Sequence, residues 1–305
     1  MKYTKRTWKQ DLKRNWPLYM IFLIPAAYFI IFKYIPMVGI LMAFEDYKPA
    51  KGLLGSTWVG MQNFVELFTG DQFPLAIRNT CAMALLNLTF GFAAPVLLGL
   101  LISQLRSPKA SRAVQTVTYM PYFVSAVVCC ALAQEFLNDT GAITQMLSVF
   151  GFDKQNWLAV NSPVFWIINC CLGIWQGAGY GAIIYIASIA NISHELYEAA
   201  AIDGASRLQR AWHVTLPGIM PAIVTMLVLK CGMLLQVGGD KILLLYNPSI
   251  YSTADVISTH VQRMGIEQMN YGYSTAVGLF NSIVGTILLV GSNAVSAKLT
   301  DTSVV

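Results

Sequence analysis

Residues 79–105, NTCAMALLNLTFGFAAPVLLGLLISQL, form an uncharged and mostly apolar stretch between Arg78 and Arg106. A helix of roughly 20 apolar residues crosses the hydrocarbon core of a bilayer, so this stretch is long enough to span a membrane. Its apolar residues are continuous rather than alternating with polar ones, which favours a helix over a strand of a membrane β-barrel. The stretch therefore predicts an α-helical membrane protein.

The whole chain is rich in apolar residues and poor in charged ones. Apolar residues make up 56% of the 305 residues and charged residues 11%, whereas soluble domains carry about 25% charge. This composition excludes an ordinary soluble enzyme and a disordered chain. We expect an all-α membrane protein with six transmembrane helices, at about 16–44, 79–105, 113–136, 164–190, 214–239 and 273–297. They form one transmembrane domain over residues 16–297, between a basic segment at 1–15 and a tail at 298–305.

The placement of Lys and Arg predicts the orientation of the chain. These residues are concentrated in the segment 1–15, in the loop after residue 105, and in the loop 191–215. Basic residues favour the cytoplasmic side of a membrane, so we expect both termini and the loop 191–215 in the cytoplasm. The net charge of +5 is small, and its placement favours membrane lipid over nucleic acid as a partner.

Motifs for catalysis are missing from the sequence. No Gly-Lys dipeptide occurs, so the chain lacks the P-loop that cradles the phosphates of ATP. The Gly-x-Ser-x-Gly and His-Glu-x-x-His patterns are also absent. His194, His213 and His260 are far apart, and we expect them to be surface groups rather than metal ligands. The sequence thus predicts no catalytic residue, no metal site and no cofactor in this chain.

The loop 191–215 has the strongest local pattern. Ser193 is a suitable N-cap for a helix that begins at His194, and Asp203–Gly204 can end that helix. Ser206 can cap a second short helix, and Leu216–Pro217 then opens the fifth transmembrane helix.

One face of the first helix in this loop is small and partly apolar. It comprises Leu196, Tyr197, Ala200, Ala201 and Gly204, with Glu195, Glu198 and Asp203 on the other side. Such a face suits docking into a groove on another protein. The alternative is an amphipathic loop that lies on the lipid headgroups.

The spacing within this loop resembles the EAA motif of permease subunits of ATP-binding-cassette (ABC) importers. That motif reads Glu-Ala-Ala, three residues, Gly, nine residues, Ile, one residue, Leu-Pro. This sequence has Glu198, Ala199 and Ala200, then Gly204, then Leu216 and Pro217, with Val214 in place of Ile as the single departure. The resemblance extends along most of the chain. Within the ABC importers, the sequence is similar to the carbohydrate-uptake branch, and there to maltose-type and complex-oligosaccharide permeases. Its shorter matches include Ile35–Gly39, Gln115–Pro121 and Ala276–Phe280.

The resemblance implies a permease subunit in a bacterial cytoplasmic membrane. Its implied partners are a second homologous permease, a cytosolic P-loop ATPase dimer that holds ATP and Mg, and an extracellular solute-binding lipoprotein. The EAA loop of such permeases docks on the ATPases, whose closure switches the permeases between inward-facing and outward-facing states. The residues to which this implies an ATPase-coupling role are Glu198, Ala199, Ala200, Asp203, Gly204, Leu216 and Pro217.

Polar side chains within the predicted spans are the candidates for a substrate pathway, because such residues are expensive in lipid. Amide groups and aromatic rings suit the hydroxyls and apolar faces of sugars. The candidates are Asn87, Gln134, Trp175, Gln176, Tyr180, Lys230 and Gln236. The alternative for each is a hydrogen bond between helices.

Two other classes of protein remain as alternatives. A secondary transporter often shows internal repeats and intramembrane acids, whereas this sequence shows no repeat and one borderline acid, Glu135. An integral membrane enzyme needs clustered His or carboxylate residues near a membrane face, which the sequence does not offer. Among ABC importers, an amino-acid or peptide substrate is the main alternative to a sugar.

Overall fold

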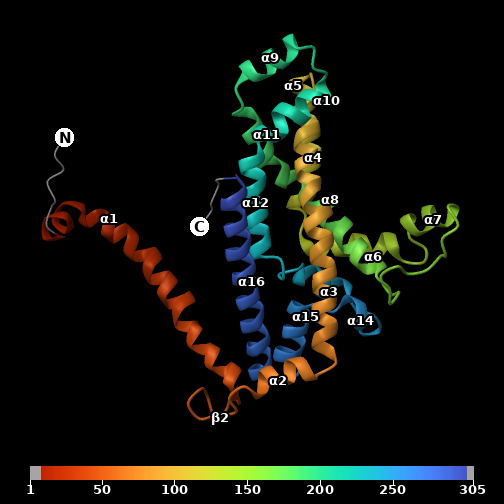
Figure 1. The fold of residues 1–305 in the computed structure, drawn as a ribbon. Helices are drawn as coiled ribbons and strands as arrows, with labels where there is room; N and C mark the ends of the chain where they lie inside the picture. The colour runs from red at the N-terminus through yellow and green to blue at the C-terminus, as the bar shows by residue number, and fades with distance from the viewer. Residues whose placement is uncertain (1–7, 301–305) are drawn as a thin grey trace.

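The computed structural model in Figure 1 describes residues 8–300 of the chain. In this part of the chain the strands are β1 (Glu45–Asp46) and β2 (Thr57–Trp58), which pair antiparallel with Glu45 opposite Trp58. The rest of the regular structure is helical, so the all-α prediction is confirmed. Part of the predicted basic segment 1–15 and most of the predicted tail 298–305 lie outside the described residues.

Several helical segments of the described chain are long and apolar enough to cross a membrane. Four are continuous, at Leu12–Phe44, Gln72–Ser103, Val164–Ala190 and Tyr271–Lys298. Two more are bent pairs, in which Pro108–Phe123 meets Ala126–Val149 at 96° and Arg207–Gly218 meets Met220–Gly232 at 60°. By length and composition, the described residues therefore contain four helices that could cross a membrane, or up to six if each bent pair counts as one.

Sixteen α-helices are assigned within the described residues. They are α1 (Trp8–Phe29), α2 (Gln62–Thr69), α3 (Gln72–Leu86), α4 (Phe92–Ser103), α5 (Pro108–Tyr119), α6 (Ala126–Leu137), α7 (Ala142–Val149), α8 (Val164–Ala190), α9 (His194–Ile202), α10 (Arg207–Arg210), α11 (Leu216–Gly218), α12 (Met220–Gly232), α13 (Gly239–Leu245), α14 (Tyr251–Ala254), α15 (Ile257–Gln262) and α16 (Tyr271–Thr300). A π-helical turn at Asn87–Gly91 joins α3 to α4 without a break in the span.

The structure breaks two helices that the sequence predicts as continuous. The predicted helix 113–136 is interrupted after α5, where Pro121 lacks an N–H donor and Ser125 caps α6 by accepting from the Val128 N–H. The predicted helix 214–239 stops at Gly232, and residues 233–238 are not helical. Gly238 has a φ of 36°, a left-handed conformation that glycine adopts readily.

The centre of the molecule is a bundle in which α4 packs along α8 and α12 packs along α16. Buried Val96, Tyr185 and Ile219 join α4, α8 and the α11–α12 junction into one apolar cluster. At Gly179 of α8 the backbone of α5 comes so close that an added Cβ would lie 2.0 Å from the carbonyl oxygen of Thr118. The bundle is therefore held by apolar contact and by close backbone approach at a glycine.

The first span stands apart from this bundle. Figure 1 shows α1 diverging from α16. None of the 18 residues in the most apolar stretch of this span is buried within the chain. Its continuation at Ile35–Phe44 does contact α16. The apolar surface of α1 thus lies open to lipid or to another protein.

Candidate functional site

Residues 191–217, which we name the EAA segment, form one end of the molecule (Figure 1). The Ser193 hydroxyl accepts a hydrogen bond from the Glu195 N–H, and α9 then runs from His194 to Ile202. Gly204 follows with a φ of 74°, and the Ser206 and Gln209 side chains form a capping box at the start of α10. These elements confirm the caps and the turn that the sequence predicts, because each depends on residues close in sequence.

Within the EAA segment, a hydrogen bond ties α9 to the turn that directly precedes α11. The Tyr197 hydroxyl in α9 lies 3.0 Å from the Thr215 hydroxyl. Thr215 is buried in the π-helical turn Ala211–Thr215, directly before α11. The contact therefore joins α9 to the residue that directly precedes α11.

The small apolar face predicted for α9 is divided in the structure. Tyr197 and Ala200 are half-buried, and Tyr197 contacts Thr215 in the turn before α11, whereas Leu196, Ala201 and Gly204 are exposed. The exposed large apolar side chains of the EAA segment are Leu196, Ile202, Leu208 and Trp212, of which Ile202 is 87% and Leu208 79% exposed. The docking role of this face stays a prediction, and the sequence analysis did not include the exposed Ile202 in it.

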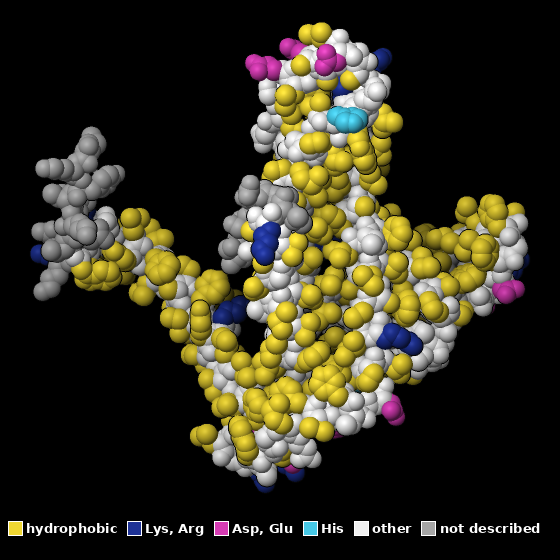
Figure 2. Space-filling view, viewed as in Figure 1, with side chains coloured by type: hydrophobic (Ala, Val, Ile, Leu, Met, Phe, Trp, Pro, Cys, Tyr) yellow, Lys and Arg dark blue, Asp and Glu magenta, His cyan; other side chains and the backbone are white. Residues whose placement is uncertain are grey.

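The other predicted coupling residues lie on or near the same surface. Glu198, Ala199, Asp203 and Pro217 are exposed, whereas Leu216 is half-buried. Figure 2 shows acidic side chains gathered over this end of the molecule, whereas the helix bundle below it is covered largely by hydrophobic side chains. The segment therefore offers both apolar and acidic groups to a partner.

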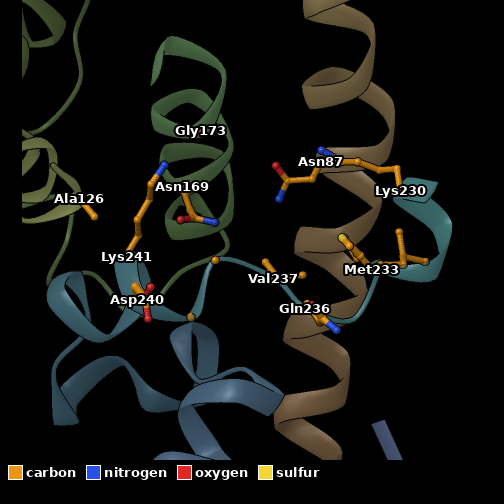
Figure 3. A pocket seen from close by; sticks show the side chains of 14 residues that line it. Asn87, Ala126, Asn169, Gly173, Lys230, Met233, Gln236, Val237, Asp240 and Lys241 are labelled. Carbon is orange, nitrogen blue, oxygen red and sulfur yellow. The ribbon is translucent and has the colours of Figure 1, made fainter. Parts of the chain in front are cut away.

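A cavity of about 500 Å³, which we name the central cavity, lies between α3, α6, α8, α12 and the chain that follows α12. Figure 3 shows this cavity from close by. Its polar lining residues are Asn87, Asn169, Lys230, Gln236, Asp240 and Lys241. The volume falls within the roughly 300–1,000 Å³ of small-molecule sites.

The central cavity lies deep within the spans. Asn87 is at the middle of the Gln72–Ser103 span, where its Nδ2 donates to the Met83 carbonyl at 3.0 Å. The opposite wall contains the non-helical residues 233–238. Irregular backbone at this depth is tolerated where it is buried in protein or lines a water-filled cavity.

Lys230 connects the central cavity to a second one of about 540 Å³ between α4, α8 and α12. Tyr180 lines the second cavity, and its ring stacks on Tyr122 with the centroids 3.9 Å apart. The two cavities together follow α8 and α12 toward the EAA segment. Of the predicted pathway residues, the structure thus places Asn87 and Gln236 at the central cavity, Tyr180 at the second cavity, and Lys230 at both.

The remaining predicted pathway residues lie elsewhere. The Gln176 Nε2 donates to the Val124 carbonyl at 2.8 Å, and the Gln134 Nε2 donates to the Leu244 carbonyl at 2.9 Å. Trp175 is 48% exposed and lines neither cavity. Gln176 and Gln134 therefore match the alternative of hydrogen bonds between segments.

Sequence reasoning missed Asn169 and Lys241 of the central cavity. Asn169 lies in an apolar run, and Lys241 lies just outside the predicted span 214–239. A signal for Lys241 was available in the adjacent Gly238 and Gly239, which mark a break in the helix.

The prediction that His260 is a surface group was wrong. His260 is fully buried, with its Nε2 3.0 Å from the Tyr273 hydroxyl and its Nδ1 3.5 Å from Asp255 Oδ2. Arg263 donates to the same carboxylate oxygen at 2.5 Å. Burial raises the pKa of Asp255, but hydrogen bonds from His260, Arg263 and Thr259 outweigh it and hold the pKa below the ordinary value. The cluster joins the end of α14 to α15 and to the start of α16.

A bundle of spanning helices with a polar cavity at its centre and a protruding EAA segment defines a membrane permease. The family of binding-protein-dependent transport system inner membrane components matches residues 95–237. The chain is 41% identical over 92% of its length to the polygalacturonan/rhamnogalacturonan transport system permease protein YteP of Bacillus subtilis (strain 168), covering 88% of that protein. It is also 39% identical over 96% of its length to Protein LplB of the same organism, covering 92% of that protein.

Solved structures give the same result. The chain matches a chain in the crystal structure of a bacterial alginate ABC transporter in complex with alginate pentasaccharide-bound periplasmic protein. The TM-score is 0.90 at 40% identity, over 98% of this chain and 100% of that one. The protein therefore belongs to the inner-membrane components of binding-protein-dependent transport systems, and its assignment to ABC importer permeases of the carbohydrate-uptake branch is confirmed. It is a multi-pass membrane transport subunit.

Proposed function

We propose that this chain forms half of the translocation pathway of an ATP-driven importer for oligosaccharides. Its relatives support this substrate class, since their names refer to polygalacturonan and rhamnogalacturonan, to diacetylchitobiose and to alginate. The central cavity supports it as well, because the amides of Asn87, Asn169 and Gln236 suit sugar hydroxyls. A solute-binding lipoprotein on the outer side delivers the sugar.

The observation that carries the coupling role is the position of the EAA segment. It protrudes beyond the spans, exposes Ile202 and Leu208, and contacts the fifth span through Tyr197 and Thr215. A cytosolic ATPase that binds these exposed residues would move the fifth span, and with it Lys230 at the cavity. Glu198, Ala199, Ala200, Asp203, Gly204, Leu216 and Pro217 form this coupling surface and its support.

ATP and Mg bind to a separate ATPase dimer in this proposal, because the present sequence has no P-loop. The EAA segment and both termini lie in the cytoplasm of a bacterial cell, and the spans lie in the cytoplasmic membrane. The basic residues at the N-terminus and in the EAA segment support this orientation.

A second, homologous permease completes the pathway in this proposal. The most apolar stretch of the span Leu12–Phe44 has no buried residue, although the span is long enough to cross the bilayer. A partner permease and lipid together would cover this surface. The central cavity would then face its counterpart in the partner.

Purification of the tagged chain from its native membrane in mild detergent tests the assembly, with mass spectrometry of the proteins that accompany it. We expect a second six-span permease and a P-loop ATPase. Recovery of the chain alone, in a preparation that still transports sugar on a proton or sodium gradient, would contradict the importer and favour a secondary transporter.

A further inference from the structure

A cavity lined by arginine side chains, which we name the arginine pocket, lies beside the EAA segment. Its volume is about 480 Å³, and it lies between the ends of α4 and α8 and the helices α9 and α10. Arg106, Arg207, Arg210 and His194 line it. The pocket shares no lining residue with the central cavity or the second cavity. It is therefore a separate site, at the end of the molecule where α9 and α10 lie in Figure 1.

The chain does not neutralise the arginine pocket. None of the residues that line it is Asp or Glu. Among the side chains that the structure describes, no ion pair involves any of its three arginines, whereas Arg263 is paired with Asp255 in the core. Like charges around one cavity repel each other, and an anion between them relieves that repulsion. The pocket therefore favours an anionic ligand.

The type and placement of the basic side chains suit a phosphate group. A guanidinium group presents several N–H donors in one plane and binds phosphate oxygens in pairs. Arg207 and Arg210 are three residues apart in α10, so they lie on the same face of that helix. Arg106 reaches the pocket from the chain that follows α4. Donors from two separate elements can thus surround one phosphate.

An apolar row on α4 leads to the arginine pocket. Leu97 and Leu101 are one turn apart, are each more than half exposed, and line neither the central nor the second cavity. Gln104 continues this row directly after the end of α4 and lines the arginine pocket. From Leu97 to Gln104 a helix rises about 10 Å, which fits within the roughly 15 Å of hydrocarbon in one leaflet. Such a row suits acyl chains, whereas a soluble phosphate has no use for it.

We infer that the arginine pocket binds the phosphate of an anionic phospholipid, whose acyl chains lie along Leu97 and Leu101. Basic pockets between spanning helices at the membrane surface bind anionic lipid headgroups. The inference concerns a lipid and does not depend on which sugar is transported. Because Arg207 and Arg210 belong to the EAA segment, the bound lipid links this segment to the nearer leaflet.

The test uses the tagged full-length chain, purified in detergent with the subunits that accompany it and washed free of lipid. Dioleoylphosphatidylglycerol, dioleoylphosphatidylcholine and inorganic phosphate are each titrated in, and bound lipid is counted by native mass spectrometry. The variants are Arg106→Gln and the double variant Arg207→Gln, Arg210→Gln. Arg112→Gln is the control, because Arg112 is exposed on α5 and does not line the pocket. Gel filtration and co-purification show that each variant folds and assembles.

We expect one phosphatidylglycerol to bind the wild type about ten-fold more tightly than phosphatidylcholine does. Loss of hydrogen bonds to a charged group should weaken its binding about ten-fold or more in the double variant and in Arg106→Gln, with Arg112→Gln close to wild type. Equal binding of phosphatidylglycerol by the wild type and the pocket variants overturns the inference. Displacement of the lipid by millimolar inorganic phosphate also overturns it and assigns the pocket to a soluble phosphate. So does a difference between variants that is present in the isolated chain and absent with its partner subunits, because a protein then covers the pocket.

Discussion

The hydroxyl of Tyr197 in α9 lies 3.0 Å from the hydroxyl of Thr215 at the entrance to the fifth span. The Thr215 hydroxyl also donates to the Arg210 carbonyl at 3.4 Å, which leaves it as the acceptor for Tyr197. This hydrogen bond links the exposed EAA segment to the helix that ends at the central cavity. It is the contact through which docking at α9 would reach Lys230.

Removal of this hydrogen bond is expected to weaken coupling. A hydrogen bond between uncharged groups contributes about 0.5–1.5 kcal/mol, so Tyr197→Phe should lower the sugar transported per ATP hydrolysed about two- to ten-fold. Thr215→Val should do the same. The double variant should be no worse than either single one, because both changes remove one interaction. Additive losses would show that the two residues act separately.

Gly204 is expected to tolerate asparagine better than valine. Its φ of 74° is unfavourable for residues with a side chain by about 1–2 kcal/mol, and asparagine adopts it more readily than others. An added Cβ would meet no atom of this chain within 4 Å. If the backbone conformation is the requirement, Gly204→Asn keeps ATPase binding in a pull-down and Gly204→Val loses it. Loss of binding in both would show that the ATPase itself occupies this space.

Glu198 is expected to act on the partner rather than on the fold. It is exposed on α9, so Glu198→Arg should leave the melting temperature in detergent unchanged while reducing ATPase binding about ten-fold. Glu195→Arg is the control, because Glu195 is also exposed and lies in the first turn of the same helix. Equal loss in both variants would indicate that the overall charge of α9 matters rather than the position of Glu198.

Gly179 is expected to be irreplaceable for packing. An added Cβ would lie 2.0 Å from the Thr118 carbonyl oxygen, so Gly179→Ala forces α5 and α8 apart. Overpacking of this kind destabilises by about 1–3 kcal/mol or more, and the melting temperature in detergent should fall by several degrees. Gly177→Ala is the matched control, because its Cβ would meet nothing within 4 Å. A normal melting temperature for Gly179→Ala would contradict the close approach of these helices.

The buried Asp255 is expected to make the folded protein less stable as the pH falls into the acidic range, and not as it rises. Because the folded-state pKa of Asp255 is lowered, its contribution is fully present above its ordinary pKa of about 3.9 and is lost as the pH falls through the lowered value. Thermal stability in detergent should show no loss from this group between about pH 5 and 8.

Asp255→Asn leaves Arg263 buried without its carboxylate and should destabilise by about 3–5 kcal/mol. The double variant Asp255→Asn, Arg263→Met should recover part of this loss, because no unpaired charge remains. If Asp255→Asn melts like the wild type, the ion pair does not hold α14, α15 and α16 together.

Features that depend on neighbouring residues could be predicted before the structure was known. The run 79–105 indicates a spanning helix because the transfer of apolar side chains into lipid is summed along one segment. The ends of α9 and α10 follow from Ser193, Gly204 and Ser206, whose effects act within one helical turn. The spacing from Glu198 to Pro217 indicated the family because the motif lies within one continuous stretch of sequence.

Which polar groups meet could not be predicted, because it depends on how distant helices pack. Asn87, Asn169, Lys230 and Lys241 come from four helices and converge because α12 ends at Gly232 and the chain turns at Gly238. His260 is buried because α15 packs beside α16 and brings it to Tyr273. Such contacts depend on helix breaks and on packing between segments far apart in the chain, and hydropathy along the sequence does not encode either of these.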